Sequence, residues 1–219
     1  MSVKIQWATP EIDKQIMYMA RVSNPTNQNS ENTRLLHYCM EHGHVSPFEM
    51  ANVCLEINTT RDIARQILRH RSFSFQEFSQ RYADVNLLGE MVERECRMQD
   101  TQNRQNSLEI REGHYGGQAT AAEWSVDQRY LWQLATEQYN RALENGVAKE
   151  VARALLPEGL TPSRLYMNGN LRSWIFYLKQ RLDPTTQKEH RAIAEQCLAT
   201  LRIVAPITMA AFFGEEQAA

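Results

Sequence analysis

The spacing of apolar residues along the chain alternates between strand-like and helical patterns. Apolar and polar residues alternate over 3–7 and 50–58, which predicts two strands, and a third strand is expected over 164–167. Apolar residues three and four apart predict helices over 9–22, 31–41, 61–70, 125–145, 149–156, 171–181 and 187–204, and Pro206 opens a further short helix. This order of elements predicts an α+β fold, mostly helical, with residues 1–219 in one domain.

The ends of two predicted helices carry specific expectations. Thr9 is expected to cap the first helix, with Pro10 at its first helical position, and Thr60 to cap the helix over 61–70. Residues 44–49 are expected to form a loop, because Pro47 interrupts any regular helix there.

Two longer stretches lack a regular period. Residues 71–82 mix serines with aromatic residues and show no clear helical spacing. Residues 90–121 are polar and irregular. We interpret residues 90–121 as a long connection or a lid, because structureless connections of this length are uncommon in compact domains unless they are functional.

Charge and cysteine content narrow the class of function. The net charge is −2, so no global basic field is available to hold nucleic acid. Arginines far outnumber lysines; guanidinium groups suit phosphates, carboxylates and imide edges, although codon bias explains the ratio equally well. The four cysteines form neither a CxxC pair nor a zinc-binding pattern, so we expect free thiols and no metal site.

The N-terminal sequence and the hydropathy of the chain bear on its location. Residues 1–11 lack the apolar core of a signal peptide, and no stretch approaches the ~18 apolar residues of a membrane span. We therefore expect a cytoplasmic protein with no membrane segment.

The segment over 61–82 carries the most informative chemistry. On a helix, Arg61, Arg65 and Arg69 stack at spacings of four residues, where like charges repel by about 0.2–0.5 kcal/mol per pair. Such a row is either a solvated basic face or an anion site. The arginines, serines and aromatic residues that follow, up to Arg81, also suit a nucleotide cradle, so local chemistry leaves both interpretations open.

This segment resembles the signature of a known family. Arg69-His70-Arg71, then seven residues, then Ser79 is similar to the RHRx7S motif of flavin-dependent thymidylate synthases. The fuller pattern RHRxxSxxExSxRY also matches, with Ser74, Glu77, Ser79, Arg81 and Tyr82 in place. The resemblance continues in the family's order through residues 20–23, 42–49, 150–157 and 170–181, and is least marked over 90–121.

The resemblance implies a fold and a reaction. The implied fold is a mostly helical domain with a small, mainly antiparallel sheet. The implied reaction is the reductive methylation of deoxyuridylate (dUMP) to thymidylate (dTMP). Methylenetetrahydrofolate donates the carbon, reduced FAD supplies hydride, NADPH reloads the flavin, and no protein nucleophile takes part. The family also forms homotetramers whose active sites are shared between subunits.

The resemblance assigns roles to particular residues. The residues implied to contact FAD are Ser23, His44, Ser46, Arg69, His70, Arg71, Glu77, Asn170 and Arg172. Those implied to hold dUMP are Gln66, Arg69, Glu77, Ser79, Arg81, Arg153 and Arg181. Arg181 is the implied catalytic residue: it faces the uracil imide, and a fixed cation there stabilises the ionised form.

Several of these residues also have ordinary structural interpretations. Arg181 is equally able to pair with Glu189 or Asp183 at a helix end, Arg153 suits an exposed helix face, and His42 and His44 suit a helix terminus. His37, His114 and His190 lie in no motif and are expected at the surface.

The chain also departs from the family pattern. Phe176 stands where many members carry a polar flavin contact, and Met50 replaces a common histidine, so one polar contact is missing or replaced. The competing hypotheses are a flavin- and nucleotide-binding homologue without synthase activity, and a non-enzymatic nucleotide-binding module.

Overall fold

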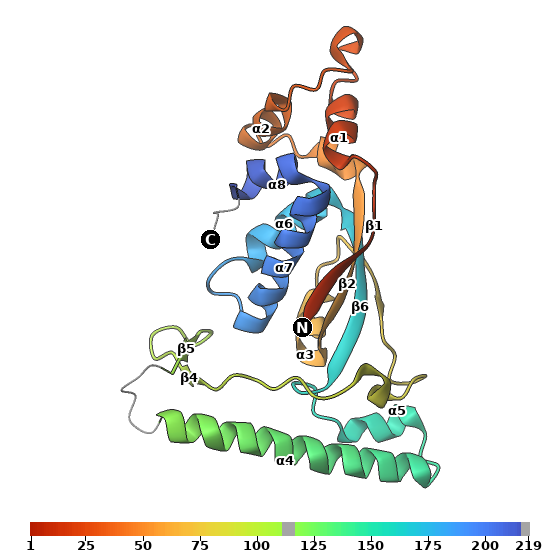
Figure 1. The fold of residues 1–219 in the computed structure, drawn as a ribbon, viewed down its shortest axis with the longest axis vertical. Helices are drawn as coiled ribbons and strands as arrows, with labels where there is room; N and C mark the ends of the chain where they lie inside the picture. The colour runs from red at the N-terminus through yellow and green to blue at the C-terminus, as the bar shows by residue number, and fades with distance from the viewer. Residues whose placement is uncertain (111–116, 216–219) are drawn as a thin grey trace.

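The computed structural model describes residues 1–110 and 117–215. Its centre is an antiparallel sheet in the order β1-β2-β6-β3, formed by Ser2–Ala8, Asn52–Thr60, Pro162–Asn170 and Ser74–Glu77 (Figure 1). The two long central strands pair along their whole length, with Leu55 opposite Met167. The small antiparallel sheet within a mostly helical chain is the predicted fold class.

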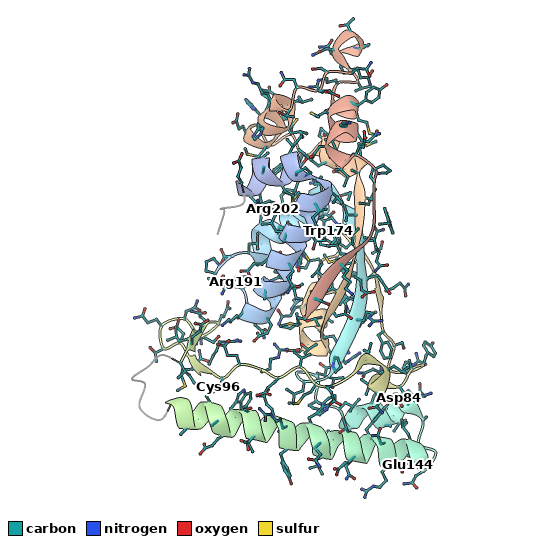
Figure 2. All side chains as sticks on the ribbon, viewed as in Figure 1. Asp84, Cys96, Glu144, Trp174, Arg191 and Arg202 are labelled. Carbon is teal, nitrogen blue, oxygen red and sulfur yellow. The ribbon has the colours of Figure 1, made fainter. Side chains whose placement is uncertain are left out.

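Helices cover one face of this sheet because the inward residues of its central strands are apolar. Val53, Leu55 and Ile57 of β2 are fully buried, as are Leu165 and Met167 of β6. Against them pack α6 (Leu171–Arg181) and α7 (Lys188–Val204), followed in the chain by α8 (Pro206–Phe213). Trp174 of α6 lies between the helices and the sheet (Figure 2), fully buried, and its indole N–H donates to the Val53 carbonyl at 3.1 Å.

Short helices lie at one end of the sheet, and their bounds correct two expectations. The elements are α1 (Ile12–Ala20), η1 (Pro25–Asn27), α2 (Arg34–Glu41) and η2 (Ser46–Met50). Thr9 does not cap α1: its hydroxyl donates to the Asn52 carbonyl at 3.3 Å, and Glu11, in a left-handed conformation at φ 48°, precedes the helix. Ser46–Met50 is a 3₁₀ turn where a loop was expected, which suits Pro47 because the first turn needs no N–H from it.

The helix α3 (Arg61–Ile67) follows β2 directly. Thr60 precedes it, but the Thr60 hydroxyl donates to the Asp62 carboxylate at 2.5 Å instead of capping a backbone N–H. Residues 74–77, part of the stretch without a clear period, form the edge strand β3 through pairing with β6. In β6, Gly169 lies against the ring of Phe73, the residue before β3: a Cβ at Gly169 would come within 2.4 Å of that ring.

The far end of the sheet carries α4 (Gly117–Glu144), α5 (Lys149–Ala152) and η4 (Arg153–Leu155) (Figure 1). The helix expected over 125–145 therefore begins at least one turn earlier. The turn η3 (Val85–Leu88) packs here through a small second core of Val85, Tyr139, Ala152 and Leu156. Among the described residues, no helix is long and apolar enough to span a membrane.

The chain between η3 and α4 is held in place by polar contacts. It contains a short hairpin of β4 (Arg97–Gln99) and β5 (Ser107–Glu109). Before the hairpin, the buried side chain of Gln128 in α4 forms two hydrogen bonds with the backbone of Arg94. Gln128 Oε1 accepts from the Arg94 N–H at 2.7 Å, and Gln128 Nε2 donates to the Arg94 carbonyl at 3.0 Å. Residues 90–110 are thus a connection with a hairpin, held in place by polar contacts. Residues 117–121 already belong to α4, and residues 111–116 lie outside the described range.

Candidate active site

The candidate site residues are organised around α3, whose side chains project in different directions. A helix turns about 100° per residue, so Arg61 and Gln66 point about 140° apart. Arg61 faces Glu77 of β3, with 3.8 Å between the guanidinium Nη1 and the carboxylate. Gln66 faces α7, where its amide donates to Gln187 at 2.7 Å. Ile63, Ala64 and Ile67 fill the core between these two directions.

One group of candidates gathers between α3, α6 and α7, and we call it the α7-side cluster: Gln66, His70, Tyr177, Arg181 and His190. Arg181 Nε–H donates to His70 Nε2 at 2.9 Å. The His70 ring lies edge-on to Tyr177, with 4.9 Å between ring centroids. Arg181 is therefore fixed by His70, and pairs neither with Glu189 nor with Asp183 as the structural interpretations suggested; its bonded Nε leaves the two Nη groups as remaining donors.

Burial and a nearby cation keep the two histidines of the α7-side cluster neutral. Burial, together with the charge of Arg181, lowers the pKa of His70 to about 4. Burial, together with Arg181 and His70, lowers the pKa of His190 to about 3. Because Arg181 donates to His70 Nε2, that nitrogen carries no proton, and the proton of neutral His70 sits on Nδ1.

These two histidines predict how stability depends on pH. The unfolded chain binds their protons near pH 6.5, above the folded values of about 4 and about 3. The contribution of these two histidines to the free energy of unfolding is therefore fully present above pH 6.5. It is lost as the pH drops below 6.5, by up to about 1.4 kcal/mol per pH unit for each histidine. We expect the free energy of unfolding in urea, at fixed protein concentration, to fall between pH 7.5 and 5.5. The decline should be smaller in His190→Asn, and an equal decline in both proteins would contradict this account.

A second group of candidates lies on the other side of α3, toward α5 and η4, and we call it the α5-side cluster: Glu77, Ser79, Arg81 and Arg153. Arg81 Nε pairs with the Glu150 carboxylate at 3.2 Å. Glu77 accepts from the buried Ser163 hydroxyl at 2.7 Å. Arg153 lines a cavity of about 400 Å³ together with Arg61, Arg65, Gln80 and Glu150. Glu158 also lines the cavity and pairs with Arg65 at 3.3 Å and with Arg61 at 3.9 Å. Three guanidinium groups thus face two carboxylates, and Arg153 is the arginine of this lining that Glu158 does not pair with, so it is the candidate for an anion.

Gln80 adds a polar group to the wall of this cavity. Its side chain is only 3% exposed, and its Nε2 has no hydrogen-bond partner among the described residues. A buried amide without a partner is costly, so this donor is suited to a bound ligand or water.

The remaining candidates lie near the start of α6 and the 3₁₀ turn η2. Asn170 caps α6, because its side chain accepts from the Ser173 N–H at 2.9 Å. Arg172 pairs with Glu49 at 3.0 Å. The Ser173 hydroxyl donates to the Ser72 carbonyl at 3.2 Å, which ties the turn after α3 to α6. Ser46 lines an apolar hollow of about 630 Å³ with Tyr18, Val22 and Met50.

Exposure separates the aromatic residues of α6. Phe176 is 49% exposed, and the Arg172 guanidinium lies 5.3 Å from the centre of its ring. Trp174 and Tyr177 instead belong to the core. Phe176 therefore exposes an apolar ring to solvent, and the Arg172 guanidinium lies over that ring. Arg69 and Arg71, in the turn after α3, and Ser23 and His44 are also exposed.

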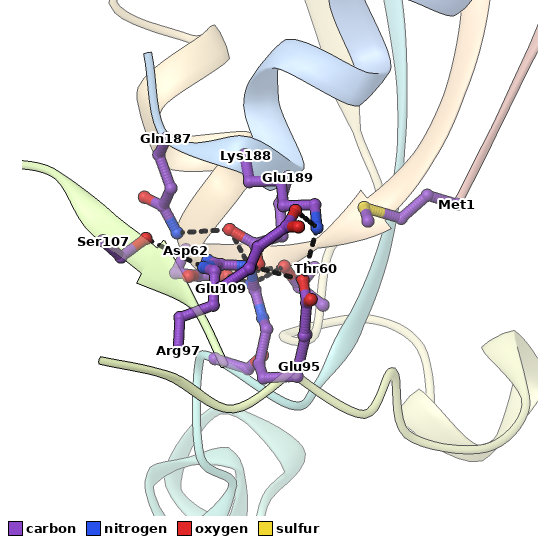
Figure 3. A network of polar contacts seen from close by, with 12 residues as sticks. Met1, Thr60, Asp62, Glu95, Arg97, Ser107, Glu109, Gln187, Lys188 and Glu189 are labelled. Carbon is purple, nitrogen blue, oxygen red and sulfur yellow. Dashed lines mark hydrogen bonds and ion pairs between the residues drawn. The ribbon is translucent and has the colours of Figure 1, made fainter. Parts of the chain in front are cut away.

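Sequence reasoning missed the buried polar residues of α7. His190 is wrongly expected at the surface: it is fully buried, whereas His37 is exposed and His114 lies outside the described residues. The missed signal is its spacing, because His190 precedes the buried Ile193, Ala194, Cys197 and Leu201 at helical intervals. The pairing of Glu189 with Arg94 and Arg97 was missed because it joins segments far apart in the chain. Figure 3 shows Arg97 and Glu189 in this network.

Comparisons with known proteins identify the family and the fold. Residues 4–207 match the model of a family described as thymidylate synthase complementing protein. A flavin-dependent thymidylate synthase of Synechocystis sp. is 49% identical over 182 residues, which cover 82% of this chain and 79% of that protein. Another, from Thermus thermophilus, is 34% identical over 203 residues, covering 91% of this chain and 71% of that protein.

A solved structure gives the same result for the fold. The crystal structure of a UMP/dUMP methylase, PolB, from Streptomyces cacaoi bound with 5-Br dUMP superimposes with a TM-score of 0.76. The alignment has 25% sequence identity and covers 98% of this chain and 95% of that one. The chain therefore belongs to the thymidylate synthase complementing protein family, the flavin-dependent thymidylate synthases.

Proposed function

We propose that this protein methylates dUMP to dTMP with FAD as its flavin, methylenetetrahydrofolate as carbon donor and NADPH as the source of reducing equivalents. The relatives named flavin-dependent thymidylate synthase support the flavin and the reaction class. The dUMP methylase with the same fold supports the nucleotide. The observation that carries the proposal is Arg181, held by its Nε so that its two terminal nitrogens remain available to a substrate.

The chemistry of the implied flavin residues fits FAD. Arg69 and Arg71 are exposed guanidinium groups on one turn, which suits a pyrophosphate. Ser23 and Ser46 add exposed hydroxyls near an apolar hollow that suits a planar ring. His44, His70, Glu77, Asn170 and Arg172 complete the proposed contacts. When bound, FAD would supply the hydride, and the protein would supply position and charge.

Arg181 would act on the uracil ring. Its guanidinium is fixed before the substrate arrives, because the neutral His70 ring holds the Nε. A fixed cation beside the imide lowers the cost of the negative charge that develops there. Arg81 and Arg153, with Ser79 and the buried Gln80 amide, would hold the phosphate, and Gln66 would contact the nucleotide from the α7-side cluster.

The separation of these residues supports a shared active site in a homotetramer. The nucleotide contacts lie in two clusters on different sides of α3, so one subunit would supply the α7-side cluster and its neighbour the α5-side cluster. Exposed apolar residues on α4 fit burial between subunits: Val126, Tyr130 and Leu131 are each more than half exposed. In this proposal the described chain acts as one catalytic domain in the cytoplasm.

The first experiment is an absorption spectrum of the purified protein, before and after adding dUMP. A bound flavin whose bands shift on adding dUMP would support one site for both ligands. A colourless protein that takes up no FAD would overturn the cofactor assignment. Formation of dTMP from dUMP, with UMP tested in parallel, then separates a synthase from a flavin-binding homologue without synthase activity, which would shift its spectrum but form no product.

Mixing two inactive variants tests whether active sites are shared. Arg181→Ala lies in the α7-side cluster and Arg153→Ala in the α5-side cluster. We expect co-expressed subunits to recover about a quarter of wild-type turnover, since random pairing completes about one site in four. As a matched control, Gln66→Ala mixed with Arg181→Ala should show no turnover beyond what the two variants show separately, because both changes lie in one cluster. Equal turnover in the two mixtures would argue for sites contained within single subunits.

A further inference from the structure

The α7-side cluster continues into a chain of hydrogen bonds whose direction is fixed from one end. Glu189 is 6% exposed and forms an ion pair with Arg97 at 2.7 Å (Figure 3) and another with Arg94 at 3.2 Å. Burial alone would raise the pKa of Glu189, but hydrogen bonds from Arg97 and Gln187 and the charge of Arg94 hold it below its ordinary value. Glu189 is therefore an ionised carboxylate, which only accepts hydrogen bonds.

Starting from this carboxylate, the donor or acceptor role of each group determines the role of the next group in the chain. Gln187 Nε2 donates to Glu189 at 2.9 Å, which leaves Gln187 Oε1 as an acceptor. Gln66 Nε2 donates to that oxygen at 2.7 Å, so Gln66 Oε1 is in turn an acceptor. His190 Nδ1 lies 3.2 Å from Gln66 Oε1 and must therefore carry the proton.

The last bond of the chain agrees with this assignment. With its proton on Nδ1, neutral His190 accepts at Nε2, and the Tyr177 hydroxyl lies 3.2 Å from that nitrogen. Burial raises the pKa of Tyr177 well above its usual value, so the hydroxyl keeps its proton and donates. Both nitrogens of the fully buried His190 ring are thus bonded, and the ring has one available orientation.

We propose that His190 is a positioning residue for Gln66: its Nδ1–H fixes the Gln66 amide in the orientation that receives the nucleotide. One Nε2 hydrogen and one Oε1 lone pair of Gln66 are used within the protein, which leaves one donor and one acceptor for a ligand. Gln66 is only partly buried, so this remaining edge is accessible. The inference rests on the proposed function, in which Gln66 contacts dUMP.

Two substitutions of His190 distinguish positioning from packing. His190→Leu fills a similar volume with an apolar side chain and removes the donor to Gln66. His190→Asn keeps an N–H near the position of Nδ1. We expect the Leu variant to bind dUMP about three- to tenfold more weakly, the loss of one hydrogen bond, and the Asn variant to bind within about twofold of wild type. Flavin content should be the same in all three proteins.

The experiment is calorimetric titration of dUMP into the flavin-loaded tetramer, with Gln66→Ala in a double-mutant cycle. If His190 acts through Gln66, His190→Leu adds no further loss in the Gln66→Ala background. Glu195→Gln, an exposed change on the same helix, serves as the control. Wild-type affinity in His190→Leu, or losses that add in the double variant, would overturn the inference alone. A wild-type protein that binds no dUMP would overturn the proposed function with it.

Discussion

Arg181→Ala is expected to lower turnover of dUMP about a hundred- to a thousandfold while the flavin bound per subunit stays within about twofold of wild type. The reason is geometric: His70 Nε2 accepts from Arg181 Nε at 2.9 Å and so fixes the guanidinium in place. A pre-oriented cation is worth most where charge develops during the reaction, and alanine leaves water there instead. Steady-state turnover and flavin absorbance on the same preparations measure the two quantities.

Two controls make the Arg181 result specific. Lys179→Ala removes a cation two residues earlier on α6, where the ammonium lies 5.0 Å from the centre of the Phe212 ring, and should change turnover little. Arg181→Lys keeps a charge but loses the planar fork, and should recover only part of the activity. If flavin content falls in step with turnover in Arg181→Ala, Arg181 is structural and the proposed catalytic role fails.

Glu189→Gln is expected to lower the free energy of unfolding by about 3–5 kcal/mol. Glu189 pairs with Arg94 and Arg97, whose guanidinium groups are mostly buried, and a neutral amide would leave these cations without their shared counter-charge. Arg94 would keep its bond to Asp62 at 2.6 Å, so part of the network would survive. Urea unfolding at fixed protein concentration measures the loss.

The control for this prediction is again on α7. Glu195 is exposed and lies 3.7 Å from Arg191, so Glu195→Gln should change stability by less than about 1 kcal/mol. Equal stabilities for Glu189→Gln and Glu195→Gln would mean that the two arginines are adequately solvated without Glu189, and that the network contributes little.

Sequence patterns predicted those helices and strands that depend on residues within or next to the element itself. The helix over 171–181 has the predicted bounds because Asn170 caps its first turn and the chain reaches Pro184 soon after its last. The strand β3 was missed, because it has four residues at a sheet edge and depends on pairing with β6. The connection before α4 was expected, but its hairpin and its fixed position were not, since Gln128 and Arg94 hold it through polar contacts that leave no apolar period.

The site was predictable in composition but not in arrangement. The motif from Arg69 to Tyr82 identified the segment. The expected helical row of Arg61, Arg65 and Arg69 holds only for the first two, because α3 ends at Ile67 and Arg69 lies in the turn after it. The division of the candidates into two clusters depends on where α5 and α7 lie relative to α3, which no spacing within the motif specifies. His190 was misjudged because histidine is usually a surface residue, and its neutral, doubly bonded state requires partners from α3 and α6.

The position of α3 limits which substitutions this sequence can accept during evolution. Its seven residues serve three neighbours at once: Arg61 meets Glu77, Gln66 meets α7, and Ile63, Ala64 and Ile67 fill the core. A substitution that shifts or rotates this short helix to relieve one neighbour displaces side chains toward the other two. Adaptation to a new nucleotide would therefore meet less resistance at Arg153 and Ala154, the cavity-lining residues of η4, than within α3, and a directed-evolution library has more room there.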